Sequence, residues 1–391
     1  EVPQDQLFNY TSHAYKELKA KFVRGRVNRI WPSDHVVEVE NGKNTFRYDK
    51  LLIAAGSFAL MPQVPGIELE GVVKLDHLDD AIQIVALAKK AKKAIIVGGG
   101  ITALELAEGL IANRVKVHYL LRGDRYWGNV LDESESRIIE HRLKEHRITI
   151  QFQAELKEII GKAGRVNGVR LESGESIACD MVAVAIGIKP RLELAQVSGI
   201  TIDRGILTDE YLQTNVESIY AAGDVAQAID SLSGKHVLDT LWTPAREQGL
   251  TAGLNMVGIR TPYCKSPPFN VTRLAGLTTT IIGQVGGGKD KDLIGIARGD
   301  SETWRDIPEA IVAQTGFEVN RLRLMIGETH LLGAVVMGDQ KLSFPIQNII
   351  ANQLDITPIR AKLLATSAPI ADILVKYGTA VKAGNGITGT Y

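Results

Sequence analysis

The segment IIVGGGITALELAEGL, residues 95–110, carries the strongest indication of the fold of this chain. It opens with an apolar, strand-like run, passes through three glycines and continues as a helical pattern over residues 103–112. A second apolar strand, residues 115–121, follows. Strand, glycine turn, helix and strand form a βαβ unit, so the sequence predicts an α/β fold with a parallel sheet.

The glycine turn has the spacing of a dinucleotide-binding site. Gly98, Gly100 and Ala103 form GxGxxA between the strand and the helix. The first glycine permits the tight turn, the second lets the backbone approach a pyrophosphate, and the small third residue allows close packing of helix on strand. The helix N-terminus adds free N–H groups and a positive dipole end. We therefore expect Gly98, Gly99, Gly100 and Ile101 to bind a dinucleotide; the alternative is a glycine turn that only packs tightly.

The end of the second strand bears on which nucleotide is bound. In NAD sites, an acidic residue roughly 20 residues after the glycines binds the ribose 2′-hydroxyl. Here the strand ends at Leu121 without a carboxylate, and Arg122 and Arg125 follow. Guanidinium groups pair well with phosphate oxygens, so we expect a preference for NADP(H). The alternative is NAD(H), with both arginines as solvated loop charges.

Length and composition indicate a soluble globular protein of more than one domain. The chain has 391 residues, 45% of them hydrophobic, with 45 basic and 45 acidic side chains. This balance gives no basic field for nucleic acid, and no apolar stretch reaches the roughly 18 residues of a membrane helix. Cys179 and Cys264 have no metal or disulfide spacing, so we expect a cytoplasmic protein without a metal site, with Cys179 in the core.

Four motifs resemble those of the FAD-dependent pyridine nucleotide-disulfide oxidoreductases. The resemblance is to the branch that includes ferredoxin and rubredoxin reductases, apoptosis-inducing-factor-like proteins and the FAD/NAD module of nitrite reductases. The motifs are YDKLLIAAGS (48–57), IIVGGGITALELAEGL (95–110), ACDMVAVAIGIKP (178–190) and TNVESIYAAGDVA (214–226). The resemblance spans about residues 1–258 and implies binding of FAD and NAD(P)H.

The resemblance also implies a flavin site built from separate segments. Asp224, which follows Gly223 at a strand end, resembles the family's aspartate that accepts a hydrogen bond from a ribityl hydroxyl. The alternative for Asp224 is a plain helix N-cap. Ala54, Ala55 and Gly56 resemble a short turn beside the flavin, with Ala55 in place of the usual threonine.

Further site residues are implied around the flavin and nicotinamide rings. Ala245, Gln248 and Gly249 resemble a helix whose N-terminal end faces the flavin pyrimidine, where its dipole stabilises the negative charge of reduced flavin. Glu105 resembles a glutamate near the nicotinamide and is the candidate catalytic residue; its alternative is an ordinary surface charge. Gly187, in the third motif, is expected to contact a cofactor.

Proline and glycine punctuation divides the chain into four parts. We expect a first part of an FAD-binding domain at residues 1–75, an NAD(P)-binding domain at 76–195, a second part of the FAD-binding domain at 196–268 and a C-terminal α+β domain at 269–391. The expected fold is α/β: a FAD/NAD(P)-binding Rossmann-like two-domain fold followed by that C-terminal domain. Outside the first βαβ unit, helical patterns predict helices over residues 79–93 and 243–257.

One unit of the family has no counterpart in this sequence. Family members begin with a strand, a GxGxxG turn and a helix that hold the FAD pyrophosphate, a unit of about 30 residues. Here EVPQDQLF, residues 1–8, resembles the stretch that follows that unit. We expect the unit to precede these residues in a longer chain or to come from another chain.

The C-terminal part carries less specific signals. NVTRLAGL (270–277), GDSETWR (299–305) and GAVVMGDQ (333–340) resemble the C-terminal domain of the nitrite-reductase-like branch, which often forms a dimer or partner interface. We therefore expect a homodimer or hetero-oligomer. On composition alone, Trp304 and Phe344 are core or interface anchors.

The function that the resemblance implies is an NAD(P)H oxidoreductase. A hydride would pass from the nicotinamide to FAD, and electrons would then reach a small iron protein, a nitrite-reducing partner, a quinone, oxygen or a disulfide. Hydride transfer needs alignment more than acid or base groups, which suits a sequence without an obvious triad. His330 lacks the following residues of a catalytic His–Glu pair. The alternatives are a non-catalytic nucleotide-binding subunit and one chain of a split flavoenzyme.

Overall fold

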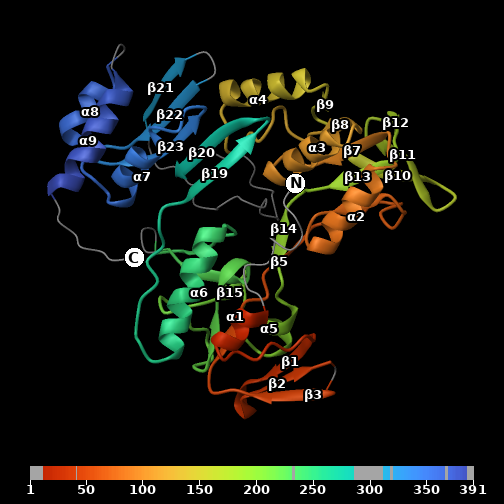
Figure 1. The fold of residues 1–391 in the computed structure, drawn as a ribbon, viewed down its shortest axis with the longest axis vertical. Helices are drawn as coiled ribbons and strands as arrows, with labels where there is room; N and C mark the ends of the chain where they lie inside the picture. Colours follow the sequence, from red (N-terminus) through yellow and green to blue (C-terminus); the bar gives the residue numbers. More distant parts are fainter. Residues whose placement is uncertain are drawn as a thin grey trace.

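The computed structural model describes residues 12–40, 42–230, 234–285, 311–317, 320–365 and 369–384. Figure 1 shows three regions. The first contains a parallel sheet, the second is C-terminal and contains an antiparallel sheet, and both also contain several helices. The third, at the bottom of the view, is built from small sheets and helices. Within the described ranges, no helix has both the length and the apolar character needed to cross a membrane.

The first region contains a parallel sheet of five strands in the order β6-β13-β7-β8-β9. The strands are β6 (Val72–Lys74), β7 (Lys93–Val97), β8 (Lys116–Leu120), β9 (Thr149–Gln151) and β13 (Met181–Val184). β7 and β13 pair at its centre, and every residue of β13 is buried. A strand covered on both faces requires a continuous apolar run, which is why MVAV shows no polar alternation.

Helices cover this parallel sheet. They are α2 (Leu78–Ala88), α3 (Ile101–Ala112) and α4 (Glu133–Glu145). α3 follows β7 directly, and β7 pairs in parallel with β8, so the predicted βαβ unit is confirmed. Ala103, Leu104 and Ala107 of α3 are fully buried, because the helix packs on the sheet with small and apolar side chains.

The position of β6 bears on the expected domain boundary. This strand pairs in parallel with β13, so it belongs to the parallel sheet although punctuation assigned it to residues 1–75. We propose that the nucleotide-binding domain begins just before β6.

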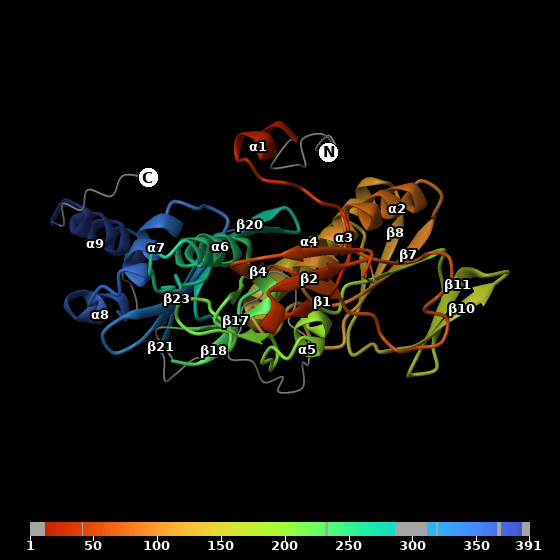
Figure 2. The same cartoon turned by 90° about the horizontal axis from the view of Figure 1, so that it is seen from below.

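An antiparallel extension projects from the first region at the far right of Figures 1 and 2. Its strands are β10 (Leu156–Lys162), β11 (Arg165–Leu171) and β12 (Ser176–Ala178).

The third region is built from two parts of the chain that lie far apart in sequence. Its early elements are α1 (Ser12–Glu17), β1 (Val27–Trp31), η2 (Pro32–Asp34), β2 (Val36–Val39), β3 (Asn44–Arg47) and β4 (Leu51–Ile53). Its late elements are α5 (Glu193–Val197), β15 (Ile206–Leu207), β16 (Ile219–Ala221), η3 (Gly223–Val225), β17 (Ala226–Ile229), β18 (His236–Leu238) and α6 (Trp242–Met256). β4 and β16 pair in parallel, which brings the first and fourth motifs together.

Two strands carry the chain between the first and third regions (Figure 1). β5 (Ser57–Ala59) leads toward the parallel sheet, and β14 (Ile188–Pro190) leads back. They pair antiparallel, with Ser57 opposite Pro190 and Ala59 opposite Ile188. The first region is therefore joined to the third region through this two-stranded crossing.

The second region in Figure 1 is C-terminal and contains an antiparallel sheet in the order β19-β20-β23-β22-β21. Its elements are β19 (Phe269–Leu274), β20 (Leu277–Gly283), β21 (Ile311–Phe317), β22 (Asn320–Ile326), β23 (Leu331–Met337), α7 (Ser343–Ala351), α8 (Thr357–Leu363) and α9 (Ile370–Gly384). Phe344 is 74% exposed, so it is not a core anchor; a role at an interface stays a prediction. Trp304, the motif at 299–305 and EVPQDQLF lie outside the described residues.

Candidate functional site

The turn between β7 and α3 has a backbone geometry that requires glycine. Gly98 has a φ of +149°, and a Cβ at this position would lie 2.2 Å from the carbonyl oxygen of Ala185. Gly100 is the N-cap of α3, with an extended backbone and no side-chain hydrogen bond to the helix. The first N–H groups of α3 therefore remain available to an anion, where the positive end of the helix dipole also acts. This cradle fits the pyrophosphate of a dinucleotide.

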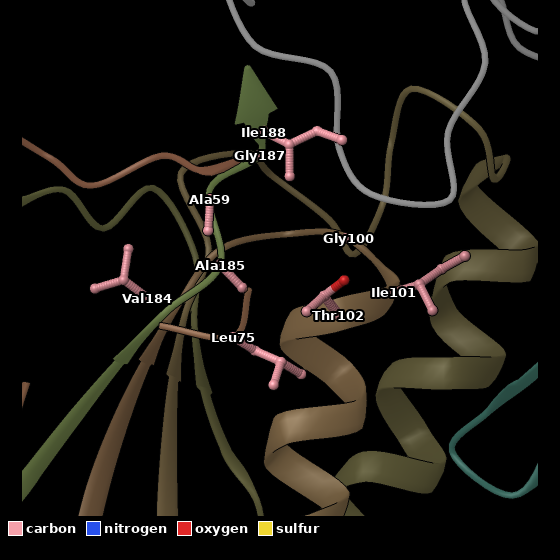
Figure 3. A pocket seen from close by; sticks show the side chains of 9 residues that line it. All are labelled: Ala59, Leu75, Gly100, Ile101, Thr102, Val184, Ala185, Gly187 and Ile188. Atoms are coloured by element: carbon pink, nitrogen blue, oxygen red, sulfur yellow. The ribbon is translucent and has the colours of Figure 1, made fainter. Parts of the chain in front are cut away.

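A crevice lies beside this turn (Figure 3). It is lined by Ala59, Leu75, Gly100, Ile101, Thr102, Val184, Ala185, Gly187 and Ile188. In open parallel sheets, ligands bind beyond the carboxyl ends of the strands at the point where the strand order reverses. Here that point lies between β7 and β13, whose following residues form walls of the crevice. Three of the predicted residues, Gly100, Ile101 and Gly187, line it.

The two arginines predicted to select the nucleotide follow the end of β8. Arg122 is exposed. The Arg125 guanidinium is engaged by its neighbours: Nη1 lies 3.2 Å from Asp124 Oδ1, and Nη2 donates to the Gly128 carbonyl at 2.9 Å. The expected contact of these arginines with a 2′-phosphate stays a prediction. The Asp124 carboxylate lies in the same loop.

Glu105 lies on α3 one turn after Ile101 and outside the crevice lining. Partial burial of its carboxylate, together with the charge of Glu108, raises the pKa of Glu105. Both glutamates also act on Tyr126, whose pKa is raised first by complete burial of the phenol and then by neighbouring negative charge. The expected place of Glu105 beside the nicotinamide stays a prediction.

A second cluster forms where the turn after β4, the turn after β16 and α6 meet. Ser57 Oγ donates to Asp224 Oδ2 at 2.6 Å, and the Gly223 N–H donates to Gln248 Oε1 at 2.7 Å. Gly56 and Gly223 have φ values of +68° and +78°, a left-handed backbone that glycine adopts without strain. Three segments of the predicted flavin site are thus brought together.

The contacts of Asp224 separate the two explanations given for it. Asp224 lies inside the η3 turn, whose N-cap position is Ala222, and this turn has no side-chain cap. Its carboxylate instead bonds to Ser57, so a plain helix cap does not describe it. Ala54 and Ala55 are exposed beside this cluster. An oriented carboxylate and the N-terminal end of α6, which holds Ala245, fit the hydroxyl chain and anionic reduced ring of a flavin.

The motifs do not reveal every contributor to the two clusters. Ser57 stands within the first motif, and a hydroxyl next to a glycine turn was the signal that could have marked it. Ala59, Leu75 and Ile188 line the crevice from three separate strand ends. They are ordinary apolar residues that no local pattern distinguishes, because only the sheet order brings them together.

Neither cluster contains a cysteine among the residues that the structure describes. Cys179 is a buried core residue, as expected, and burial raises the pKa of its thiol to about 12. Cys264 is exposed. Across the described ranges, no group of three or more His, Cys, Asp or Glu side chains is arranged to hold a metal ion.

Comparison with known proteins places the chain among nucleotide-dependent reductases. The chain is 36% identical over 226 residues to an NAD(P)H sulfur oxidoreductase (CoA-dependent) from Pyrococcus abyssi, covering 57% of this chain and 50% of that protein. It is 30% identical over 263 residues to a rubredoxin-NAD(+) reductase from Pseudomonas putida, covering 67% of each chain. Several curated relatives are thus about twice as long as the matched part.

A solved structure confirms the fold. A ferredoxin reductase from Rhodopseudomonas palustris aligns with a TM-score of 0.83 at 20% identity, covering 95% of this chain and 86% of that one. The two-domain FAD/NAD(P)-binding architecture with a C-terminal domain is therefore confirmed. Residues 8–249 match the family described as pyridine nucleotide-disulphide oxidoreductase. The chain belongs to the pyridine nucleotide-disulphide oxidoreductase family, the family that its four motifs resemble.

Proposed function

We propose that this chain works as an NAD(P)H-dependent flavoprotein oxidoreductase, with NAD(P)H in the crevice beside α3 and FAD beside the Ser57–Asp224 pair. The observation that carries the proposal is the placement of the two clusters at opposite ends of the crossing strands β5 and β14. When bound, FAD supplies the hydride-accepting ring and a route for electrons to an acceptor. The similarity to a sulfur oxidoreductase and to a rubredoxin-NAD(+) reductase supports this class of reaction.

In the crevice, the residues of the chain bind and orient the nucleotide. Gly98 and Gly100 let the backbone approach the pyrophosphate, and the N-terminus of α3 stabilises its charge. Leu75, Val184 and Ile188 provide apolar walls that exclude water from the nicotinamide. Alignment of this kind is the main contribution that a protein makes to hydride transfer.

On the flavin side, the residues of the chain hold a carboxylate in a fixed orientation. Ser57 donates its hydroxyl proton to one oxygen of Asp224, which leaves the other oxygen to accept from a ribityl hydroxyl. Gln248 accepts from the Gly223 N–H and so holds the turn that carries Asp224. The N-terminal end of α6 favours negative charge on the reduced ring.

The electron acceptor is proposed by class. The names of relatives span sulfur compounds, rubredoxin and nitrite, which agrees with the expected range of iron proteins, nitrite-reducing partners, quinones, oxygen and disulfides. We propose that the protein works in a reducing cytoplasm, because Cys179 and Cys264 are both free thiols.

An anaerobic visible spectrum tests the proposed reaction. The protein, prepared with the pyrophosphate-binding unit that we expect to precede residues 1–8 and supplied with FAD, is expected to show an oxidised-flavin band that bleaches after stoichiometric NADPH is added. Tight NAD(P)H binding without flavin uptake would instead favour a non-catalytic nucleotide-binding subunit or one chain of a split flavoenzyme. The mass of the native complex separates these two, because a split enzyme retains a second chain.

Arg122→Glu tests the proposed NADP(H) preference. We expect the dissociation constant of NADPH to rise about tenfold while that of NADH changes little, because a carboxylate repels the 2′-phosphate. Arg137→Glu is the matched control, since Arg137 is an exposed arginine of α4 paired with Glu133. Fluorescence titration with both nucleotides gives the ratio, and an unchanged ratio contradicts the preference.

A further inference from the structure

Arg191 lies where the nucleotide-binding domain joins the third region. It follows β14 directly, and its backbone N–H donates to the carbonyl of Gly56 at 3.0 Å. Its side chain contacts the same segment. Nε donates to the Ser57 carbonyl at 3.0 Å, and the guanidinium carbon lies 5.4 Å from the Phe58 ring centroid. One residue thus holds the start of β5 through backbone and side chain together.

The other side of the Arg191 guanidinium contacts the nucleotide-binding domain. Nη2 donates to Asp76 Oδ2 at 3.1 Å, and the Asp76 side chain is only 1% exposed. Lys74 Nζ lies 3.2 Å from the same oxygen. Burial alone would raise the pKa of Asp76, but Lys74, His77 and Arg191 together lower it, so this carboxylate is ionised at neutral pH.

Asp76 is itself fixed at the entry of a helix. Its backbone N–H donates to Asp80 Oδ2 at 2.9 Å, and the next backbone N–H, of His77, donates to the same oxygen at 3.0 Å. Asp80 is in the first turn of α2, with His77 as the N-cap. The ion pair with Arg191 therefore attaches the end of β6 and the start of α2 to the crossing strands.

Ser57 continues the chain of contacts to the flavin side. Its carbonyl oxygen accepts from Arg191, and its hydroxyl donates to Asp224. The hydrogen bonds therefore run from Asp76 through Arg191 and Ser57 to Asp224, linking the two proposed cofactor sites. The pairing depends on the planar fork of arginine, which presents donors in two directions, whereas lysine presents one charge centre.

The same residues frame the nucleotide crevice. Leu75, next to Asp76, lines one wall, while Ala59 and Ile188 of the crossing strands line the other (Figure 3). Besides the Asp76–Arg191 pair, the short β5–β14 ladder joins the two crossing strands, and Arg191 Nη2 also lies 3.4 Å from His77 Nε2. The ion pair is therefore one of the contacts that join the wall at Leu75 to the crossing strands.

We propose that Arg191 is a positioning residue that sets the crevice width and couples it to the orientation of Asp224, through Asp76 on one side and Ser57 on the other. The inference rests on the proposed function for the identity of the nucleotide. It predicts that Asp76 and Arg191 act as one unit, so that their substitutions are not additive.

A double-mutant cycle on nucleotide affinity tests the proposal. Arg191→Gln and Asp76→Asn are each expected to raise the dissociation constant of NAD(P)H about tenfold, and the double variant no further, because each single change already breaks the link.

Arg191→Lys keeps a charge for Asp76 but loses the bond to Ser57, so we expect wild-type thermal stability with a weakened affinity for NAD(P)H. Arg165→Gln is the control, since Arg165 has an exposed pair with Glu70 in the same domain.

Hydrogen exchange gives a readout that does not need a bound nucleotide. In Arg191→Gln, peptides covering residues 56–60 and 221–226 are expected to exchange faster, whereas Ser57→Ala speeds only the second. Additive affinity losses, or unchanged exchange in both peptides, would overturn the proposal. If wild-type chain binds neither NADH nor NADPH, the proposed function fails, and the exchange data alone decide the role of Arg191.

Discussion

Gly98 and Asp224 show how single residues set the two proposed cofactor sites. At Gly98 the constraint is steric: the backbone is left-handed, and the Ala185 carbonyl oxygen occupies the space of a Cβ. At Asp224 the constraint is directional, because the Ser57 hydroxyl takes one carboxylate oxygen. Sequence spacing predicts the first constraint. It does not predict the second, which depends on a residue from another strand.

Gly98→Ala tests the steric constraint. We expect a loss of about 2 kcal/mol or more in unfolding free energy, because the methyl group meets the Ala185 carbonyl and the backbone is strained. The matched control is Gly109→Ala in α3, where a Cβ meets no atom within 4 Å. That change should stabilise by about 0.5–1 kcal/mol, since alanine is the better helix former. Urea unfolding measures both, and equal effects would contradict the constraint.

At the scale of elements, the helices show which sequence signals suffice. The predictions over residues 103–112 and 243–257 lie close to α3 and α6. The prediction over 79–93 is wrong at its end, because α2 stops at Ala88 and Lys93 begins β7. Helical spacing cannot indicate where α2 ends, because the end of the helix is set by the pairing of β7 between β13 and β8.

The start of α4 is stabilised by a capping box that also binds another domain. Asp132 accepts from the Glu135 N–H at 2.8 Å, while Glu135 accepts from the Asp132 N–H at 2.9 Å. Asp132 Oδ2 also lies 2.7 Å from Arg321 Nη2 of β22. The same carboxylate therefore caps the helix and pairs across the domain contact.

Asp132→Asn separates these two roles through pH. Burial would raise the pKa of Asp132, but the Glu135 N–H and Arg321 lower it below its ordinary 3.8. The carboxylate therefore stabilises the fold above about pH 4, and this contribution is lost as the pH falls through the folded-state pKa. Asparagine still caps, so we expect a loss of about 1–2 kcal/mol at pH 7 that shrinks toward pH 3.

Urea unfolding between pH 3 and 7 measures this difference. Glu133→Gln is the control, because Glu133 is an exposed first-turn residue paired only with Arg137 among the contacts described for it. Its expected effect is below about 0.5 kcal/mol at every pH. A gap between wild type and Asp132→Asn that stays constant with pH would show that the charge of Asp132 does not contribute.

At the scale of the whole molecule, the nucleotide-binding and C-terminal domains share one core. Leu274, Ile281 and Met337 belong to the same buried cluster as Tyr126 and Ile139. Arg323 lies at this contact and is 6% exposed. Its guanidinium donates to Glu135 Oε1 and to the carbonyls of Val285 and Val130, each at 2.8 Å. The two domains should therefore unfold together.

Arg323→Met tests this coupling. We expect a loss of about 3–5 kcal/mol, because the fully buried Glu135 is left without its main cationic partner. Adding Glu135→Gln should recover part of the loss by removing the buried charge. Arg137→Met on the same helix is the exposed control. Urea unfolding followed by fluorescence and circular dichroism checks the result, and separate transitions for the two domains in wild type would contradict a shared core.

The amino-acid sequence alone predicts the βαβ unit, the glycine turn, the flavin-associated motifs and the family. These are local properties, because glycine spacing and continuous apolar runs reflect backbone conformation and burial within one segment. The pairing of Asp76 with Arg191, of Ser57 with Asp224 and of Arg323 with Glu135 is seen only in the folded chain. Such pairs arise from strand order and from crossing strands, and the periodicity of side chains along one segment does not encode which distant segment will lie beside it.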